Sequence, residues 1–313
     1  MIYVNKLREG DRIKQIFLMR ARKTAVSKAG KPYETLTLQD KTGALDAKIW
    51  DIDNGGIESV DAPAYVEVSG DISKYMGKLQ MSVKRLRKAD SSEYNEADYM
   101  PVSPYPIDQM YENIEKLIDG VEEEHLKALL DSFFRDEDFK KAFCTHSAAK
   151  SVHHGFVGGL LQHTFFVART CDFLSRQYPQ LNHDLLVTAA LCHDIGKLKE
   201  LSTFPENDYT DEGQLIGHIV IGIEMITEKI RDIEGFPKTL ATELKHCIAA
   251  HHGEFEFGSP KKPALIEAVA LNYADNIDAR MEIFKEALDA ATPDSYEFLG
   301  FNNFLGSNIR RTH

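Results

Sequence analysis

The first ninety residues alternate between apolar and polar positions with a period of two, which is typical of half-buried β-strands. Turn-forming residues, among them Gly30, Lys41-Thr42-Gly43, Gly55-Gly56 and Gly77, separate the alternating runs. The runs are rich in β-branched and aromatic residues and predict five strands, over 13–26, 33–40, 44–51, 64–73 and 78–88. Five short strands within about eighty residues suit a small closed barrel.

The pattern changes after residue 106 to apolar positions at spacings of three and four, which predicts α-helices. We expect helices over 107–121, 123–134, 158–177, 183–195, 216–230, 239–252 and 263–284. Residues 89–106 hold three prolines and little periodicity, so they are interpreted as a linker. The tail 298–313 has aromatics and glycines without a clear period, and it packs either on the body or on another subunit. The chain is therefore expected to be a multidomain α+β protein, with a barrel over 1–88 and an all-α bundle over 107–313.

Charge divides the chain in the same place. The net charge is −12, yet residues 1–90 contain 17 Lys and Arg against 12 Asp and Glu. The remaining residues contain 20 basic against 37 acidic side chains, so the two regions are expected to have different partners.

No apolar stretch is long enough to span a bilayer, the N-terminus lacks the apolar core of a signal peptide, and the four cysteines form no CxxC pair. These features predict a cytoplasmic protein with reduced thiols and no membrane contact.

All 12 histidines follow residue 106, and several stand at the ends of apolar helical runs. They are His153, His154, His163, His193, His218, His251 and His252. Asp194 adjoins His193, and Asp275 lies in a late apolar helix. Imidazole and carboxylate without thiolate suit a Lewis-acidic divalent ion such as Mn²⁺, Fe²⁺, Co²⁺ or Zn²⁺, and differ from a structural zinc pattern. A metal ion would also compensate the charge of Asp194, which is costly to bury unpaired. Gly196 is interpreted as allowing the turn that points His193 and Asp194 into one cavity.

These residues resemble two known families. His163…His193-Asp194…Asp275 is similar to the H…HD…D signature of the HD phosphohydrolase superfamily, and His218 and His251/His252 resemble the subgroup with a second ion. The passage LTLQDKTGALDAKIWD resembles the strand–turn–strand of nucleic-acid-binding OB-fold domains, with an SH3-like barrel as the structural alternative. An OB-type barrel before an HD domain, together with the segments HHGFVGGLLQHT, LCHDIGK and AAHHGEFEFGSPKKP, resembles the YhaM family of 3′-5′ exoribonucleases over nearly the whole chain.

The resemblance implies a site with two divalent ions, with manganese the first expectation. The first ion would be held by His163, His193, Asp194 and Asp275, and the second by Asp194, His218 and His251, with His252 as an additional candidate. A metal-bound hydroxide would attack phosphorus in line and release nucleoside 5′-monophosphates from single-stranded RNA. Lys197 would contact a phosphate oxygen, or else be a solvated surface lysine. His154 would contact substrate or orient a ligand, whereas His153 is interpreted as structural.

The barrel is expected to supply the RNA-binding groove that the acidic region lacks. The candidate contact residues are basic or aromatic: Arg20, Arg22, Lys23, Tyr33, Lys48, Trp50 and Tyr75. Core packing is an equally good account of Trp50, and ordinary solvated surface is the alternative for the lysines. Single-stranded DNA is a second candidate ligand, and a homo-oligomer is compatible with the sequence.

Two other functions remain open at this stage. The first is an HD phosphohydrolase of small or cyclic nucleotides in which the barrel serves assembly or regulation. The second is a nucleic-acid-binding regulator with a vestigial HD site. A site freed from metal binding would tolerate loss of Asp194 or His218, and both residues are present, which argues against this alternative.

Overall fold

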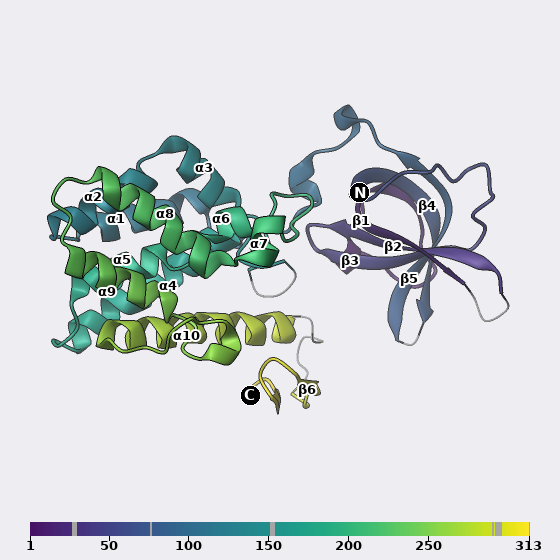
Figure 1. The fold of residues 1–313 in the computed structure, drawn as a ribbon. Helices are drawn as coiled ribbons and strands as arrows, with labels where there is room; N and C mark the ends of the chain where they lie inside the picture. The colour runs from purple at the N-terminus through teal and green to yellow at the C-terminus, as the bar shows by residue number, and fades with distance from the viewer. Residues whose placement is uncertain (27–29, 76, 151–153, 290, 292–295, 313) are drawn as a thin grey trace. The chain divides into compact units, whose positions relative to one another are not determined.

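The structure, a computed structural model, describes residues 1–26, 30–75, 77–150, 154–289, 291 and 296–312. His153, which the sequence suggests is structural, lies outside these ranges. The chain divides into two compact units (Figure 1). One unit is Met1–Val102 with Phe204–Glu206, and the other is Ser103–Thr203 with Asn207–His313. The division after Val102 falls inside the stretch 89–106 that the sequence marks as a linker.

The first unit is a closed five-stranded barrel. Its strands are β1 (Arg12–Val26), β2 (Pro32–Asp40), β3 (Gly43–Ile49), β4 (Ala64–Tyr75) and β5 (Lys78–Lys88). Around the barrel the order is β1-β2-β3-β5-β4, and β3 pairs with β5 in parallel while the other pairs are antiparallel. This Greek-key closure is the OB-type barrel, so the OB prediction is confirmed over the SH3-like alternative.

Alternation along the strands fills the barrel interior. Phe17, Leu38, Ile49, Val66 and Met81 come from five different strands and are fully buried in one apolar cluster. The β2–β3 turn falls at Lys41-Thr42, as the sequence predicts, because Asp40 pairs with Gly43. The buried Asp40 carboxylate accepts hydrogen bonds from the backbone N–H of Val4 at 2.6 Å and of Thr42 at 2.7 Å. Short segments flank the barrel: the 3₁₀ turns η1 (Val4–Lys6), η2 (Ser91–Glu93) and η3 (Glu96–Asp98).

The second unit is helical. Its helices are α1 (Ile107–Asp119), α2 (Glu124–Phe134), α3 (Glu137–Thr145), α4 (Gly159–Gln177), α5 (His183–Cys192), α6 (Lys197–Glu200), α7 (Asp211–Leu215), α8 (His218–Asp232), α9 (Lys238–Ala249) and α10 (Ile266–Asp289). A 3₁₀ turn η4 (Phe255–Phe257) follows α9, and the strands β6 (Phe301–Asn302) and β7 (Ser307–Asn308) form a two-stranded sheet near the C-terminus. None of these helices combines the length and apolar character required to cross a membrane.

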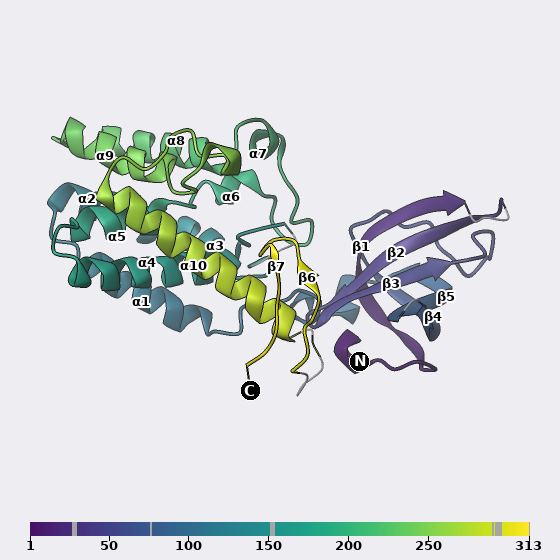
Figure 2. The same ribbon diagram turned by 90° about the horizontal axis from the view of Figure 1, so that it is seen from below.

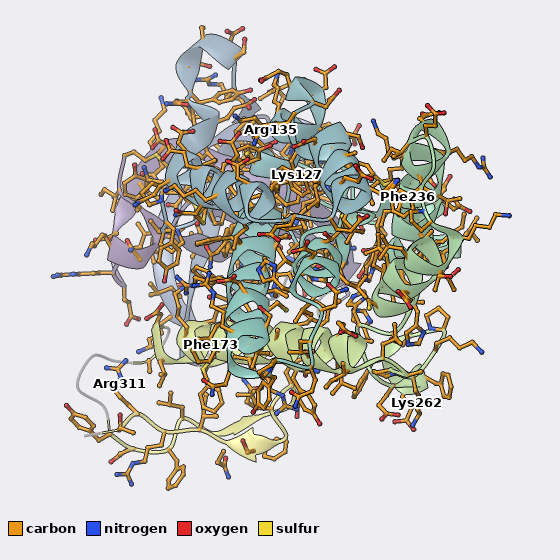
Figure 3. All side chains as sticks on the ribbon, turned by 90° about the vertical axis from the view of Figure 1, so that its left-hand side faces the viewer. Lys127, Arg135, Phe173, Phe236, Lys262 and Arg311 are labelled. Carbon is orange, nitrogen blue, oxygen red and sulfur yellow. The ribbon has the colours of Figure 1, made fainter. Side chains whose placement is uncertain are left out.

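Helix α5 is the centre of the helical unit. Every residue of Leu185–Cys192 is buried, and α5 contacts α4, α9 and α10. Figure 2 shows α10 running across α4 and α5 on one face of this unit. Directly after α2, Arg135 (labelled in Figure 3) pairs with Glu115 at 2.7 Å and Asp119 at 3.0 Å, and so ties the end of α2 to α1.

The seven predicted helices are present, with shifted ends. Three shorter helices, α3, α6 and α7, are not predicted by the sequence pattern. Helix α3 has nine residues and fully buries only Phe143, which is too little apolar periodicity to detect. The predicted helices over 183–195 and 239–252 end earlier, at Cys192 and Ala249. His193, Asp194, His251 and His252 therefore lie just beyond helix ends.

Candidate metal centre

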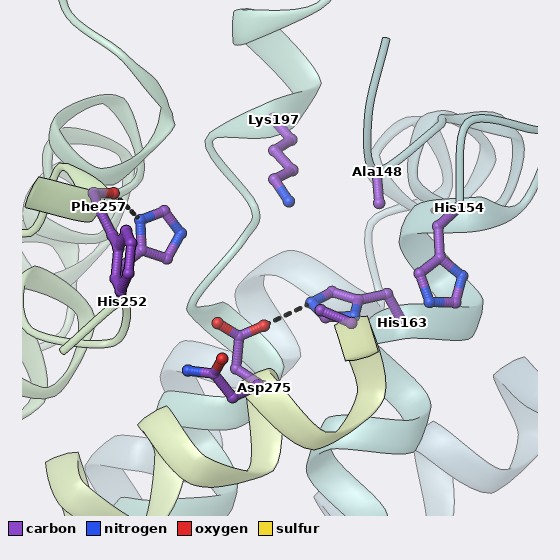
Figure 4. Close-up of a pocket in the computed structure, with 9 residues that line it drawn as sticks. Ala148, His154, His163, Lys197, His252, Phe257 and Asp275 are labelled. Atoms are coloured by element: carbon purple, nitrogen blue, oxygen red, sulfur yellow. Dashed lines mark hydrogen bonds and ion pairs between the residues drawn. The ribbon is translucent and has the colours of Figure 1, made fainter. Parts of the chain in front are cut away.

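Five helix-associated segments contribute polar side chains to one buried site. The residues are His163 on α4, His193 and Asp194 after α5, His218 at the start of α8, His251 and His252 after α9, and Asp275 on α10. Figure 4 shows part of this site, with His163 and Asp275 facing each other, Lys197 above them and His252 to one side. The pocket there has a volume of 320 Å³.

One group of ligand atoms surrounds His163. Its Nε2 lies 3.2 Å from His193 Nε2, 3.2 Å from Asp275 Oδ1 and 3.3 Å from Asp194 Oδ2. The Nε2 of His193 is also 3.3 Å from that Asp194 oxygen. Ligands about 2.1 Å from one ion lie roughly 3.0–3.4 Å apart in octahedral or tetrahedral geometry. These spacings are therefore those of a coordination shell.

A second group shares Asp194. Its Oδ1 lies 3.5 Å from His218 Nε2 and 3.8 Å from His251 Nε2. All three atoms are buried and have no hydrogen-bond partner among the described residues. His252 belongs to the same cluster, since its ring offers a ligand atom within 4.8 Å of those of His218 and His251. Buried polar atoms without partners are rare and costly, and a cation at this point would satisfy all of them.

The tautomers of the histidines are fixed by their other ring nitrogen. In three rings Nδ1–H donates to a backbone carbonyl at 2.7 Å: His193 to Ala190, His251 to Ile248 and His252 to Phe257. In the other two rings Nδ1–H donates to a carboxylate: His163 to Asp278 at 2.7 Å and His218 to Glu200 at 2.9 Å. Carbonyl and carboxylate oxygens only accept, so each ring, when neutral, directs an Nε2 lone pair into the site. Burial alone would lower the pKa of His163, but the carboxylates of Asp194, Asp275 and Asp278 hold it well above its ordinary value, so this position favours a positive charge. Nε2 lone pairs and carboxylate oxygens gathered at one place fit divalent cations.

Local structure explains two of these ring orientations. His193 and His251 each follow the last residues of a helix and bond back to the carbonyl three residues earlier. The final carbonyls of a helix have no intrahelical donor, so an imidazole placed there satisfies one of them. Burial and the neighbouring His252 and His193 hold the pKa of His251 well below its ordinary value, which keeps the ring neutral.

Gly196 acts by size rather than by turning the chain. The chain turns over residues 193–196 as expected, but the φ of −62° and ψ of −21° at Gly196 are ordinary right-handed values that do not require glycine. A Cβ at this position would lie 2.0 Å from the carbonyl oxygen of His218 and 2.7 Å from the backbone nitrogen of Gly222. Only glycine lets the start of α6 approach the start of α8 closely enough to bring Asp194 and His218 together.

Lys197 also faces the site. Its Nζ lies 2.7 Å from Asp194 Oδ2 and its side chain is only 16% exposed, so the alternative of a solvated surface lysine is wrong. Burial alone would raise the pKa of Asp194, but the charge of Lys197 and the neighbouring rings of His193 and His163 hold it well below the usual value. Asp194 is therefore a carboxylate within the buried site.

His154 reaches the site through a carboxylate. Its Nε2–H donates to Asp278 Oδ2 at 2.8 Å, and the same oxygen accepts from His163. The Nδ1 of His154 is buried without a partner among the described residues, and the ring lines the pocket. His154 has a φ of +61°, a region that non-glycine residues rarely adopt, and the absence of a side chain on Gly159 makes room for its carbonyl.

Sequence reasoning missed Asp278 and Glu200. Asp278 orients His163 and His154, and Glu200 binds His218 through both its ring and its backbone N–H. Asp278 stands three residues after Asp275, on the same side of α10, and that spacing is the signal that could have found it. No comparable signal marks Glu200, because its partner lies 18 residues away.

On the barrel, three of the candidate RNA-contact residues lie together. The rings of Tyr33 and Trp50 stack with centroids 5.0 Å apart, and Lys48 Nζ lies 4.8 Å from the first ring and 5.3 Å from the second. Trp50 is 53% exposed, so the core-packing alternative is wrong. We call Tyr33, Lys48 and Trp50 the aromatic platform.

The other four barrel candidates lie apart from this platform or already have partners. Arg22 pairs with Glu34 at 2.7 Å and donates to the carbonyls of Glu58 and Val60. Arg20 donates to Gln39 and to the Glu206 carbonyl, both at 3.2 Å. Lys23 and Tyr75 are exposed. The structure therefore does not bring all seven candidates into one cluster.

Comparison with known proteins agrees with this architecture. Residues 160–280 match the HD domain family. The 3′-5′ exoribonuclease YhaM of Bacillus velezensis is 32% identical over 288 residues, covering 92% of this chain and 91% of the relative. YhaM of a Geobacillus species is 33% identical over 289 residues, covering 92% and 88%. The solved second OB-fold domain of replication protein A from Methanococcus maripaludis covers 28% of this chain and 93% of that domain at 21% identity, with a TM-score of 0.23.

The helical unit is thus an HD domain, the fold of metal-dependent phosphohydrolases, and it follows an OB-type barrel. The chain is an enzyme of the hydrolase class. It belongs to the YhaM family of 3′-5′ exoribonucleases.

Proposed function

We propose that this protein removes nucleotides one at a time from the 3′ end of single-stranded RNA and releases nucleoside 5′-monophosphates, using two divalent ions bound in the HD domain. The observation that carries the proposal is the set of imidazole Nε2 atoms gathered around the Asp194 carboxylate, where Asp194 Oδ1 and the Nε2 atoms of His218 and His251 are buried without a hydrogen-bond partner among the described residues. The family to which the chain belongs supports the reaction and its direction.

The two groups of ligand atoms supply two ion positions. His163, His193, Asp194 and Asp275 would hold the first ion, and Asp194, His218, His251 and His252 the second. Asp194 would bridge them, since its two oxygens face the two groups separately. Imidazole and carboxylate donors without thiolate favour Mn²⁺, and they also accept Fe²⁺, Co²⁺ or Zn²⁺. When bound, such ions lower the pKa of a coordinated water and neutralise charge on the reacting phosphate.

The chain's own residues would orient the substrate around this centre. Lys197 Nζ lines the pocket and would donate to a non-bridging phosphate oxygen, which stabilises the negative charge that develops there. His154 would hydrogen-bond the substrate through its buried Nδ1, with Asp278 fixing the ring from the other side. Glu200 would fix the orientation of the His218 ring so that its Nε2 faces Asp194.

The aromatic platform would bind the RNA strand. Two stacked rings next to an ammonium group offer a base-stacking surface with a nearby counter-charge for phosphate, and neither interaction depends on sequence. Lys23 and Tyr75 are exposed and would contact other parts of the strand, whereas Arg22 pairs with Glu34. A stacked base requires an unpaired strand, so single-stranded RNA is the expected ligand and single-stranded DNA the competitor.

The test is turnover of a 5′-labelled single-stranded RNA with Mn²⁺. We expect a ladder that shortens from the 3′ end, release of nucleoside 5′-monophosphates, and loss of both on addition of a chelator. A 3′-phosphate or a stable duplex should slow or stop degradation. Immediate appearance of the labelled mononucleotide without a ladder would contradict the direction. If the protein hydrolysed free or cyclic nucleotides but left RNA undegraded, the proposed RNA substrate would be wrong.

A further inference from the structure

Two phenylalanines stand exposed beside the metal centre. They are Phe255 and Phe257 of the turn η4, which begins three residues after His252, and the two residues are 61% and 65% exposed. Large aromatic rings at the edge of a polar pocket lose favourable burial unless a ligand covers them. Their different surroundings indicate which of them meets a ligand.

The Phe255 ring already has a neighbour. Lys262 Nζ lies 5.7 Å from its centroid, and Lys262 (labelled in Figure 3) is held there by an ion pair with Glu254 at 2.5 Å. Phe255 is also absent from the lining of the pocket. Its ring therefore belongs to the surface of the loop.

Phe257 differs on both points. Among the described residues its ring has no aromatic or cation partner, and it lines the pocket together with His163, Lys197, His252, Asp275 and Asn276. Figure 4 shows it on the His252 side, opposite His154. Its carbonyl accepts the 2.7 Å hydrogen bond from His252 Nδ1, so the backbone that carries the ring is fixed to the candidate metal site.

The pocket limits what can cover this ring. A volume of 320 Å³ is at the small end for ligand sites and has room for about one nucleotide. Lys197 and the ion positions would take the phosphate, and Asn276 also lines the pocket. The largest apolar surface of a nucleotide is the face of its base. Among the described residues that line the pocket, Phe257 is the one large apolar side chain, since Ala148 and Ala279 present only methyl groups.

We infer that Phe257 is a stacking subsite for the base of the 3′-terminal nucleotide. This inference rests on the function proposed above, because it requires the scissile phosphate to lie at the ion positions. The subsite would accept any of the four bases, since each presents a π-face, but it would require that a base be present. The enzyme would thereby recognise a complete terminal nucleotide rather than the sugar-phosphate chain alone.

The first experiment measures removal of the terminal nucleotide from 5′-labelled RNAs that differ by one abasic residue, at the terminal, penultimate or third position from the 3′ end. In the intact protein we expect the terminal abasic residue to lower kcat/KM about tenfold, with smaller effects inward. Phe257→Ala should lower kcat/KM on unmodified RNA about tenfold and make it insensitive to the terminal abasic residue. Phe257→Trp should restore the sensitivity, and Phe255→Ala should behave as the intact protein.

The second experiment detects stacking without turnover. In an Asp194→Asn background, RNA with 2-aminopurine at its 3′ end should lose fluorescence on binding, and adding Phe257→Ala should abolish that loss while adding Phe255→Ala should not. Intact protein that degrades RNA but ignores the terminal abasic residue would overturn the subsite and leave the proposed function standing. Intact protein that degrades no RNA would overturn both. Equal effects of Phe255→Ala and Phe257→Ala would show a loop contribution to folding and would also overturn the subsite.

Discussion

The barrel and the HD domain place their candidate functional side chains in opposite ways. On the barrel, Tyr33, Lys48 and Trp50 lie on the surface, where each contact is weak and replaceable. In the HD domain, His163, His193, Asp194 and His251 are buried and converge on shared points. An exposed group can adapt to a varying ligand, whereas a buried polar group is tolerated only when its partners are fixed. Binding of a variable strand and chemistry on one phosphodiester bond therefore suit different regions of the chain.

The largest expected effect separates the two regions directly. Asp194→Asn should lower kcat by a factor of at least about 10³, because the neutral amide no longer balances two ion positions. RNA affinity in a filter-binding or anisotropy assay should stay close to that of the intact protein, since the platform is untouched. Loss of affinity equal to the loss of turnover would mean that the barrel does not bind RNA independently.

A second expected effect concerns the carboxylates that orient histidines. Asp278→Ala and Glu200→Ala remove the acceptors of His163 and His218, so the Mn²⁺ concentration for half-maximal activity should rise about 10- to 100-fold. RNA affinity should not change. Asp172→Ala is the matched control, because Asp172 also binds a histidine ring (His183 Nε2, 3.1 Å) but touches none of the candidate ligands. A metal requirement raised equally by the control would contradict the orienting role.

Two glycines in contact with each other test the packing that assembles the site. Gly196→Ala would force a Cβ against the His218 carbonyl at 2.0 Å and should lower the free energy of unfolding by about 1–3 kcal/mol, with loss of activity. Gly222→Ala meets nothing closer than 3.5 Å and lies within α8, so it should be neutral or stabilise by up to about 1 kcal/mol. Denaturant unfolding and activity of the pair check this. Similar behaviour of the two variants would mean that α6 and α8 need not touch.

The smallest expected effect is on the barrel. Trp50→Ala should weaken binding of long single-stranded RNA about tenfold, through loss of one base-stacking surface. Trp50→Phe keeps a ring over Tyr33 and should retain most of the affinity. The kcat for short oligonucleotides should be the same in both variants. A change in kcat with unchanged affinity would assign Trp50 to the reaction rather than to binding.

Much of the fold was predictable because it depends on local periodicity. The five strands follow from alternation, and the β2–β3 turn from Asp40 and Gly43. The seven longer helices follow from apolar spacing, but α3, α6 and α7 do not, since short helices present too few apolar positions. Helix ends were less certain, and in α5 and α9 the shorter true ends are what allow His193 and His251 to bond back onto the helix.

The candidate metal ligands could be predicted by residue type, but the residues that orient them could not. His163 and Asp278 are 115 residues apart, and the contact exists because α4 packs against α10. Residue type does not decide whether Lys197 faces solvent or substrate, and its ion pair with Asp194 inside the site excludes solvent. Residue type does not place Trp50 either, and its stacking on Tyr33 at the barrel surface excludes the core.

The sequence by itself determined the two regions of different periodicity, the segregation of every histidine into the second region, and the residue types suited to divalent ions. These properties depend on composition and on neighbours a few residues apart, so the linear chain contains them. Only the tertiary structure decided which nitrogen of each imidazole faces the site, which carboxylates orient the rings, and that Phe257 rather than Phe255 borders the pocket. Those outcomes depend on close contacts between segments distant in sequence, where a shift of about one ångström changes a hydrogen bond into no bond.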